Sequence, residues 1–235
     1  NEKIICTNLW SSELSKLISN AFLAQRISSI NSVAAICEES GADVREVSQA
    51  IGSDRRIGKE FLNAGPGFGG SCFKKDILNL VYLCRHFGLE EVAIYWEQVV
   101  LINSWNQKRI YKIIVQKLFG NIAGKKLAVL GYAFKANTND TRESPSRSII
   151  KYLLSEEAII AIHDPKVSET QISNELKEDF ANIKINDASE NKMWTFSRDI
   201  YETVKNADAI IILTEWDVYS KLDWSKISIL MRHPA

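Results

Sequence analysis

The first half of the sequence carries long apolar segments with few charges. Between residues 14 and 37 only Lys16 and Arg26 are charged, and no Gly or Pro occurs from Ser12 to about residue 39. This pattern predicts a long helix with Ser12 as its N-cap, and Gly41 supplies a C-terminal stop. Because the segment is apolar on most sides, we expect the helix to be buried against partner helices.

Further helices follow in the same half. A short helix is predicted from Asp43 to Ile51, and the basic stretch Asp54–Asn63 is prone to turns. A second long segment predicts a helix from Phe73 to Phe87. A third, from Glu90 to about Phe119, again lacks Gly and Pro and would span about 45 Å. The first half is therefore predicted to be helical.

The second half changes its periodicity. Short continuous apolar runs occur at Lys126–Gly131, Ile159–Pro165 and Ala209–Thr214. Continuous rather than alternating runs are typical of parallel strands that are covered on both faces. Helical segments at about Ser146–Ser155 and Ile200–Asn206 separate them, which predicts a doubly wound α/β domain.

Two segments of this half are less regular. The charged stretch Val167–Arg198 is interpreted as a helix plus a surface excursion, and a strand-like apolar run ends near Met231. The fold class is α/β, with a helical domain over residues 1–118 and a doubly wound parallel-sheet domain over residues 119–235.

Composition narrows the functional classes. The chain has 235 residues, 46% of them hydrophobic, and its 29 basic and 29 acidic side chains cancel. Such a composition excludes a disordered chain, and the zero net charge argues against an electrostatic nucleic-acid binder. No apolar run approaches the length of a membrane span and no secretory leader is recognisable, so we expect a cytoplasmic protein.

The cysteines and histidines do not form a metal-binding pattern. Cys6, Cys37, Cys72 and Cys84 include no C-x-x-C pair, and the three histidines are scattered. Cys37 and Cys84 lie in apolar helical segments and are interpreted as core thiols. Without a secretory signal, free thiols in a reducing compartment are expected.

The loop Gly65–Gly70 formally matches the dinucleotide-binding pattern G-x-G-x-x-G, but its context argues against that function. The fingerprint follows a β-strand, whereas helix-like residues precede this loop. An active-site loop is favoured, with a simple helix connector as the alternative. Cys72 would lie at the start of a helix, where amide groups and neighbouring lysines favour the thiolate, and Asp76 would lie one turn later.

Two further groups of polar residues could carry chemistry. Lys16 and Asn20 are four residues apart and share a face of the long helix. A lysine in so apolar a helix shifts its pKa readily, although a lysine that extends to solvent at a helix end is an equal alternative.

The second group follows the first predicted strand of the α/β half. Ligands bind at the carboxyl ends of strands in open α/β sheets. Lys135 and Arg142 could engage phosphate there, beside a helix that starts at Ser144-Pro145. A solvated polar loop is the alternative. Asp164-Pro165 and the residues after Thr214 also lie at strand ends, where they could serve capping or packing.

Ordered motifs across the chain resemble one known family. They are Glu13–Asn31, Gly67–Asp76, Gly131–Lys135, Asn139–Ser144 and Leu213–Asp217. They resemble the central and C-terminal domains of the UDP-glucose/GDP-mannose dehydrogenase family, and of its UDP-glucose-oxidising members in particular. The resemblance implies a helical dimerisation domain followed by a Rossmann-like UDP-binding domain. It also implies two-step, NAD-dependent oxidation of UDP-glucose to UDP-glucuronate by a homodimer or a larger homo-oligomer.

The resemblance also implies roles for individual residues. Cys72 would be the nucleophile that forms a thiohemiacetal and then a thioester, with Lys16, Asp76 and Asn20 handling protons, the oxyanion and water. Substrate-binding positions would be Arg56 (acting on the partner subunit's substrate), Phe61, Leu62, Asn63, Gly67, Phe68, Gly69, Phe134 and Lys135. Cofactor contacts would come from Cys72 and Arg142, and no metal is implied.

The chain departs from the family in what it lacks. The N-terminal NAD-binding domain with its own fingerprint and the extreme C-terminus do not occur in this sequence. We therefore expect a fragment of a longer enzyme that does not turn over alone. Two alternatives remain open: a dehydrogenase for another sugar nucleotide, such as GDP-mannose or UDP-N-acetylmannosamine, and a non-catalytic dimerisation and UDP-sugar-binding module.

Overall fold

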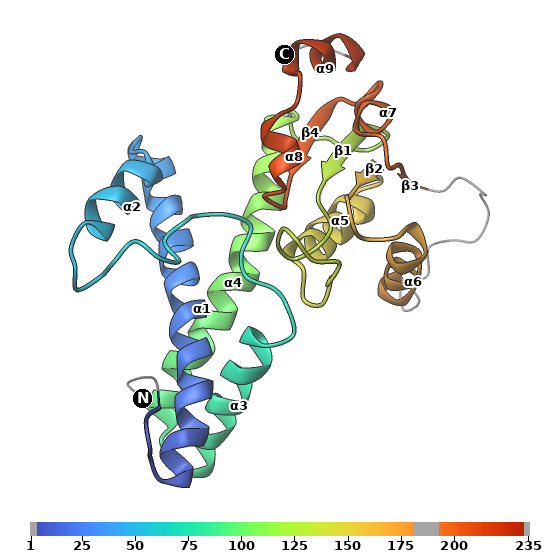
Figure 1. The fold of residues 1–235 in the computed structure, drawn as a ribbon. Coiled ribbons are helices and arrows are strands. Elements are labelled where there is room, and N and C mark those ends of the chain that lie inside the picture. The colour runs from blue at the N-terminus through green and yellow to red at the C-terminus, as the bar shows by residue number, and fades with distance from the viewer. Residues whose placement is uncertain (1–3, 181–192, 233–235) are drawn as a thin grey trace. The chain divides into compact units, whose positions relative to one another are not determined.

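The computed structural model describes residues 4–180 and 193–232 (Figure 1). The chain forms two compact units, Asn1–Asn106 and Gln107–Ala235. The first is helical and the second contains a β-sheet, which confirms the predicted α/β class with a helical first part. The division between the two units falls within helix α4 (Glu90–Lys117), which contributes residues to both units.

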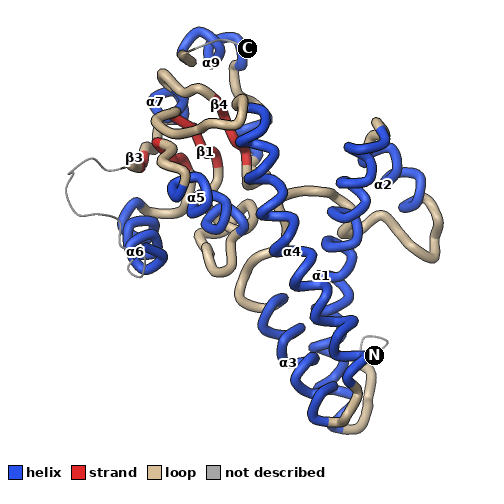
Figure 2. The backbone as a smooth tube through the Cα atoms, turned by 180° about the vertical axis from the view of Figure 1, so that it is seen from behind, coloured by secondary structure: helices blue, strands red, loops and turns tan. Residues whose placement is uncertain are grey.

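Four helices are described in the first half of the chain. They are α1 (Leu9–Ser40), α2 (Val44–Gly52), α3 (Phe73–His86) and α4 (Glu90–Lys117). All four predicted segments are thereby confirmed, with ends that differ by a few residues. Helices α1 and α3 pack along each other in both ribbon views (Figures 1 and 2). This pairing brings polar positions of α1 beside the start of α3.

The predicted N-cap of α1 is wrong. The cap is Asn8, whose Oδ1 accepts a hydrogen bond from the backbone N–H of Ser11 at 2.8 Å. Ser12 lies in the first turn, with its own N–H bonded to the Asn8 carbonyl at 3.0 Å. Asparagine caps a helix as well as serine does, so the helix begins directly after Asn8. The predicted stop is confirmed, because Gly41 has φ 76° and donates to the Cys37 carbonyl.

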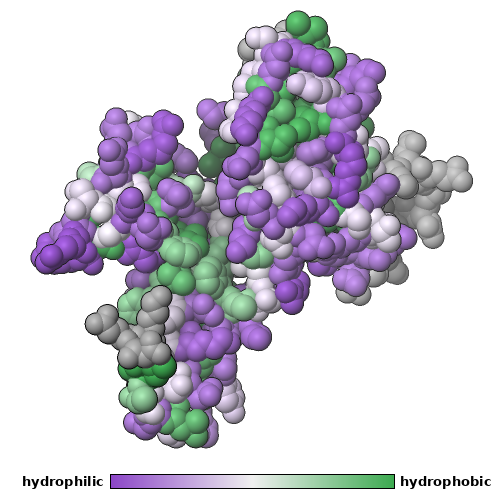
Figure 3. Space-filling model, viewed as in Figure 1, coloured by the Kyte–Doolittle hydropathy of each residue, from purple (hydrophilic) through white to green (hydrophobic). Residues whose placement is uncertain are grey.

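Helix α1 is not buried on most sides within one chain, so that expectation is also wrong. Small residues such as Ala21 and Ala24 are fully buried, while the large side chains of Trp10, Phe22 and Ile36 are exposed. Apolar and polar areas lie next to each other over the helical unit in the space-filling view (Figure 3). The apolar composition of α1 therefore reflects surface that this chain alone does not cover.

A four-stranded parallel sheet organises the second unit. Its strands are β1 (Lys126–Leu130), β2 (Ile159–His163), β3 (Trp194–Phe196) and β4 (Ala209–Ile212), in the order β3-β2-β1-β4. The three predicted strands are confirmed. Chain order reverses across β1, as in doubly wound sheets, so loops after β1 and β4 meet at one edge.

Two details of this unit differ from the prediction. Strand β3 was not foreseen because it has only three residues, lies at the sheet edge and is partly exposed, so it has no continuous apolar run. The strand-like run near Met231 is the helix α9 (Trp224–Leu230), in which Ile227 is buried and Ile229 is exposed. A short apolar run does not separate a strand from a helix by itself.

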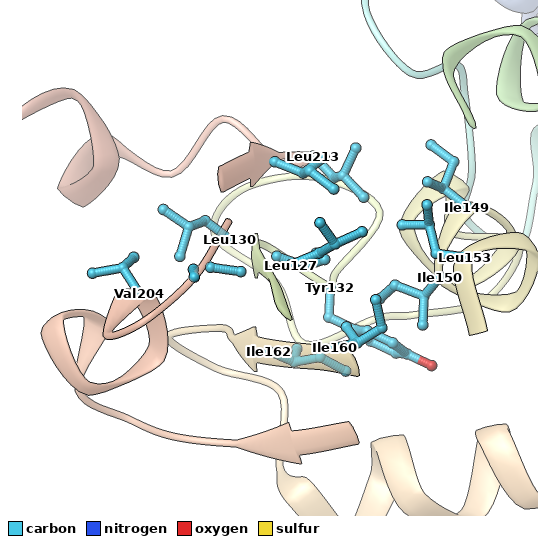
Figure 4. Packing of buried hydrophobic residues seen from close by; sticks show 14 of the residues in the cluster. Leu127, Leu130, Tyr132, Ile149, Ile150, Leu153, Ile160, Ile162, Val204 and Leu213 are labelled. Carbon is cyan, nitrogen blue, oxygen red and sulfur yellow. The ribbon is translucent and has the colours of Figure 1, made fainter. Parts of the chain in front are cut away.

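Helices complete the second unit. They are α5 (Pro145–Ser155), α6 (Glu169–Phe180), α7 (Ile200–Val204) and α8 (Asp217–Ser220), besides α9. The start of α5 is as predicted, with Ser144 as N-cap and Pro145 in the first turn. Figure 4 shows the core, in which Leu127 and Ile160 lie toward Ile150 and Leu153 of α5 while Leu130 lies beside Val204.

None of the helices in the described part of the chain combines the length and hydropathy needed to cross a membrane.

Candidate active site

Helices α1 and α3 bring three predicted catalytic residues together. Asn20 Nδ2 of α1 donates a hydrogen bond of 2.6 Å to Asp76 Oδ2 of α3. Lys16 Nζ, one turn earlier on α1, lies 3.8 Å from the same oxygen. The Asp76 side chain is 3% exposed, whereas that of Lys16 is 71% exposed. A buried carboxylate is thus held between an amide and an exposed ammonium group, an arrangement suited to proton handling.

Cys72 lies at the start of the helix that carries Asp76. It is the N-cap residue of α3, its side chain is exposed, and within the described residues it makes no side-chain capping bond. Its Sγ is 3.6 Å from Ser71 Oγ. The N–H of Asp76 bonds to the Cys72 carbonyl at 2.8 Å, so the thiol and the carboxylate are one helical turn apart. Helix amides and an exposed position suit a nucleophilic thiol.

The loop before Cys72 is fixed at Gly65 by two asparagines. Asn31 Oδ1 of α1 accepts the Gly65 N–H at 2.9 Å, and Asn106 Nδ2 of α4 donates to the Gly65 carbonyl at 2.9 Å. Both asparagine side chains are almost fully buried. Backbone groups of a loop must find such partners when they leave solvent, so the loop is held in one conformation.

Arg26 of α1 holds the segment ahead of this loop. Its guanidinium donates to the carbonyls of Glu60, Ile57 and Gly58 at 2.9, 2.9 and 2.7 Å. Arg26 is one of only two charged residues between positions 14 and 37, and the sequence alone assigned it no role. The sequence did contain a signal for this contact, because a charged residue in an apolar helix needs a partner that compensates its partial burial.

The predicted substrate-binding residues of this unit differ in their exposure to solvent. Arg56 is 89% exposed and pairs with Asp54, with 2.6 Å between Nη2 and Oδ2. Phe61 has φ 58° and is 41% exposed, and Asn63 is exposed. Leu62 is buried, and its carbonyl accepts from Ser48 Oγ at 2.6 Å. Exposed and buried positions alternate in this segment, so only some side chains face solvent.

The remaining predicted loop residues lie deeper. Phe68 and Gly69 are buried and Gly67 is half-buried. No strand precedes the loop, which follows a series of turns, so the rejection of a dinucleotide fingerprint is confirmed for these residues. Gly67 and Gly70 have φ of 124° and 84°, values that glycine adopts readily.

In the second unit, Asp164 fixes the loop that follows β1. Its carboxylate is fully buried and accepts the N–H groups of Tyr132 and Ala133 at 2.8 and 3.0 Å. The N–H groups of Lys166 and Val167 bind its other oxygen at 2.8 and 2.9 Å. Of capping and packing, the two roles left open for Asp164, the structure shows capping, because both carboxylate oxygens accept backbone N–H groups.

The same loop is closed on its other side by Thr214. Its Oγ1 donates to the Ala133 carbonyl at 2.7 Å, and Ser144 Oγ donates to the Tyr132 carbonyl at 2.8 Å. Gly131 has φ 99°, and a Cβ there would overlap the Thr214 side chain. Side chains of the protein therefore hold the backbone of the loop after β1 in place.

Phe134 and Lys135 extend from this fixed loop. Phe134 is half-buried and Lys135 is exposed, with its Nζ 5.4 Å from the centre of the Phe134 ring. Arg142 lies further along and forms two hydrogen bonds with Asp140, at 2.9 Å from Nε and 2.7 Å from Nη2. These bonds lower the pKa of the Asp140 carboxyl below its ordinary value. Lys135 is thus an exposed cation on this loop, whereas the Arg142 guanidinium is bonded to Asp140.

No group of three or more histidine, cysteine or acidic residues that could hold a metal occurs in the described ranges 4–180 and 193–232. Cys37 and Cys84 are buried, as expected of core thiols, and Cys6 is exposed. His163 is also buried, with its Nδ1 2.9 Å from the Tyr219 hydroxyl, and burial lowers its pKa. Cys72 and Cys6 are therefore the exposed thiols, and Cys72 is the one at the end of the glycine loop.

The family matches follow each other along the chain in the same order as the helical unit and the sheet-containing unit. Residues 10–105 match the UDP-glucose/GDP-mannose dehydrogenase family, central domain, and residues 128–235 match the UDP binding domain of that family.

Individual relatives agree with this match. The chain is 52% identical to the UDP-glucose 6-dehydrogenase of Gallus gallus over 234 residues, covering 100% of this chain and 47% of that protein. It is 49% identical to UDP-glucose 6-dehydrogenase 2 of Oryza sativa subsp. japonica over 241 residues, covering 100% and 50%. The chain therefore spans about half the length of these relatives.

A solved structure shows the same fold. The UDP-glucose dehydrogenase from the hyperthermophilic archaeon Pyrobaculum islandicum superimposes with a TM-score of 0.75 at 32% identity. The match covers 91% of this chain and 45% of that one.

Proposed function

Because the chain belongs to the UDP-glucose/GDP-mannose dehydrogenase family, we propose that it forms the central and UDP-binding parts of an NAD-dependent UDP-glucose 6-dehydrogenase. Such an enzyme oxidises the C6 alcohol of UDP-glucose through the aldehyde to the carboxylate of UDP-glucuronate. The observation that supports this most is the buried Asp76 carboxylate, held by Asn20 and Lys16, one helical turn from the exposed Cys72.

Cys72 carries the covalent chemistry in this proposal. Its thiolate adds to the C6 aldehyde, and a C–S bond forms as the carbonyl becomes the alkoxide of a thiohemiacetal. Loss of hydride from that carbon gives a thioester. Water then adds to the thioester carbonyl, the C–S bond breaks, and the products are the carboxylate and the free thiol. A thiol is therefore needed only for the second oxidation and the hydrolysis.

The residues around Asp76 supply the accompanying proton transfers. Asp76 orients and deprotonates water, and its burial between α1 and α3 keeps it in place. Lys16, whose side chain is exposed, stabilises the oxygen anion as it develops. Asn20 donates to Asp76 with its amide group and so fixes which oxygen of the carboxylate faces the reactants. Each of these roles uses a geometry that the helix pairing already provides.

NAD supplies the hydride acceptor, but the described residues do not form a site for it by themselves. The two amides after β1 that could cradle a dinucleotide phosphate are already bonded to Asp164, and Thr214 fills the space beside Gly131. Cys72 and Arg142 remain as contacts from this chain. We accordingly propose that further sequence provides most of the NAD site and that these 235 residues alone do not turn over.

We propose UDP-sugar contacts for each unit by itself. Lys135, supported by the Phe134 ring, would pair with the diphosphate, and the segment from Phe61 to Gly69 would follow the nucleotide. Arg56 is exposed and so able to reach the partner subunit's substrate. A few local cations suffice for a diphosphate even though the chain is neutral overall.

Assembly is proposed to be a homodimer, or a larger homo-oligomer, through the helical unit. The exposed Phe22 and Ile36 of α1 and Leu101 and Trp105 of α4 are large apolar side chains that a partner subunit would cover. A cytoplasmic location is proposed with it, because all four cysteines are free, as in a reducing compartment.

The test is the Cys72→Ser variant of the complete protein in which this chain occurs. We expect kcat with UDP-glucose and NAD to fall by about 10³-fold or more, since serine is not activated in a site built for a thiolate. The control is Cys6→Ser, which alters an exposed cysteine outside the loop and should keep the wild-type rate. Wild-type rates in Cys72→Ser would remove the thiol from the mechanism.

Substrate identity is tested separately. Turnover of the wild-type protein is compared on UDP-glucose, GDP-mannose and UDP-N-acetylmannosamine. We expect kcat/KM to be highest for UDP-glucose by at least about 10²-fold. A preference for either other sugar nucleotide would reassign the substrate within the family, and binding without turnover of any would favour a non-catalytic module.

A further inference from the structure

Asn103 of α4 binds both polar backbone groups of Phe68. The Phe68 N–H donates to Asn103 Oδ1 at 2.9 Å, and Asn103 Nδ2 donates to the Phe68 carbonyl at 3.0 Å. The Asn103 residue is 6% exposed. The Asn103 carboxamide thus forms hydrogen bonds with both the N–H and the carbonyl of Phe68. Both groups are buried, where an unpaired polar group would cost free energy.

Gly67 makes this approach possible. It has φ 124°, and a Cβ at this position would overlap Asn103 Oδ1. Both the backbone conformation and the missing side chain are required for the asparagine to reach the next residue. The glycine at position 67 is therefore explained by contact with Asn103, before any ligand is considered.

The Phe68 side chain connects this backbone contact with the start of α3, beside Cys72. Its ring is 4% exposed and packs in the hydrophobic cluster of the helical unit. The centre of the ring lies 5.8 Å from that of Phe73, with the planes at 83°. Phe73 is the first residue of α3 and directly follows Cys72. A chain of contacts therefore joins Asn103, through Phe68 and Phe73, to the start of the helix where the thiol lies.

We propose that Asn103 is a positioning residue for the Cys72 thiol, acting through the Phe68 backbone and ring. The inference rests on the proposed function, in which Cys72 attacks the aldehyde. Asn103 touches neither Cys72 nor the reacting atoms in this assignment. Gly65 keeps its own anchors, Asn31 and Asn106, when Asn103 is changed, so the effect falls on the end of the loop nearest the thiol.

Asn103→Asp is the most informative substitution, because it is nearly isosteric. A carboxylate oxygen still accepts the Phe68 N–H, but the other oxygen faces the Phe68 carbonyl and repels it. A protonated carboxyl restores the lost donor. We expect kcat of the variant, relative to wild type, to fall by about tenfold or more as pH rises from about 5 to 9, and KM for NAD to stay near wild type.

A second measurement does not depend on turnover. The alkylation rate of Cys72 is measured against that of Cys6, an exposed cysteine outside the loop that serves as internal reference. In Asn103→Asp at high pH, and in Asn103→Gln, we expect the Cys72-to-Cys6 ratio to fall by about threefold, because the thiol no longer stays at the α3 N-terminus, which favours thiolate. Asn79→Asp, an exposed asparagine of α3, is the matched control and should leave the ratio unchanged.

The outcomes separate the two proposals. A fallen ratio together with a pH-dependent loss of kcat supports the inference. An unchanged or raised ratio, or a loss of kcat that is the same at every pH in this range, overturns it. A wild-type protein without any dehydrogenase activity contradicts the proposed function, while the alkylation ratio still decides the role of Asn103. If Asn103→Asp does not fold, the alkylation ratio of Asn103→Gln, which keeps the amide one methylene further out, decides the role of Asn103.

Discussion

Asn20 of α1 donates a hydrogen bond to Asp76 of α3, and only 2.6 Å separate Nδ2 from Oδ2. The two residues are 56 positions apart in the sequence. Their contact joins the two helices at the point where the glycine loop ends. The Asn20 amide therefore helps to orient the buried Asp76 carboxylate. The amide and the carboxylate can be substituted separately.

Asp76→Asn removes the charge while keeping the shape. We expect kcat of the complete protein to fall by about 10²–10⁴-fold, since a proton-handling group is lost, with KM for UDP-glucose little changed. Thermal unfolding should stay close to wild type, because a buried charge is replaced by a neutral group. Steady-state kinetics measure this, with Glu91→Gln, an exposed acid of α4, as control. Near-wild-type kcat in Asp76→Asn would mean that the carboxylate is not used.

Arg26→Lys tests the anchor of the segment that carries Arg56. Lysine keeps the charge but cannot bond the three carbonyls of Ile57, Gly58 and Glu60 in one plane. We expect local opening of residues 57–60 to become easier by about 1.5–3 kcal/mol. Hydrogen exchange of these amides measures it, and Arg55→Lys, an exposed residue nearby, serves as the comparison. Equal protection in both variants would show that the guanidinium bonds do not hold the segment.

Asp164→Asn should destabilise the sheet-containing unit. An amide nitrogen replaces one oxygen and then faces N–H donors, either those of Tyr132 and Ala133 or those of Lys166 and Val167. We expect the free energy of unfolding to fall by about 3–5 kcal/mol, as when one partner of a buried charged group is lost. Denaturant unfolding checks this against Asp199→Asn, since asparagine also caps the start of α7. A loss below about 1 kcal/mol would contradict the role given to Asp164.

Arg142→Gln should raise the pKa of Asp140. In the wild type, hydrogen bonds from Arg142 lower this pKa below its ordinary value of 3.8. The associated stability is therefore present above pH 3.8 and is lost as pH falls through the lowered pKa. The arginine side chain is 68% exposed, so solvent screening limits this contribution to at most about 1 kcal/mol. Carboxyl NMR titration measures the shift, and an unchanged Asp140 pKa in the variant would show that the pair does not persist in solution.

Much of the fold could be predicted because its signals are local. Gly41 ends α1 and Ser144-Pro145 begins α5, since the backbone conformation at each depends on the residue type there. Periodicity predicted the three longer strands. It could not predict β3, whose three residues become a strand through pairing with β2, a contact distant in sequence.

The same distinction between local signals and contacts distant in sequence applies to the candidate site. The sequence could single out Cys72, Asp76, Lys16 and Asn20 as unusual residues in their segments, and helical spacing paired Lys16 with Asn20. It could not predict that Asn103 binds Phe68, because asparagine in a helix is ordinarily solvated and its partner here is a backbone group 35 positions away.

The sequence by itself determined the longer helices, the longer strands, the family resemblance and the residue types available for chemistry, because these depend on local backbone preferences and periodic burial. The tertiary structure alone decided which polar groups meet. Packing α1 against α3 gave Asp76 its two partners, and closing the sheet made Asp164 a buried anchor for the loop after β1. Hydrogen bonds and ion pairs act over a few ångströms, so which residues they join is determined only once the packing of distant segments is fixed.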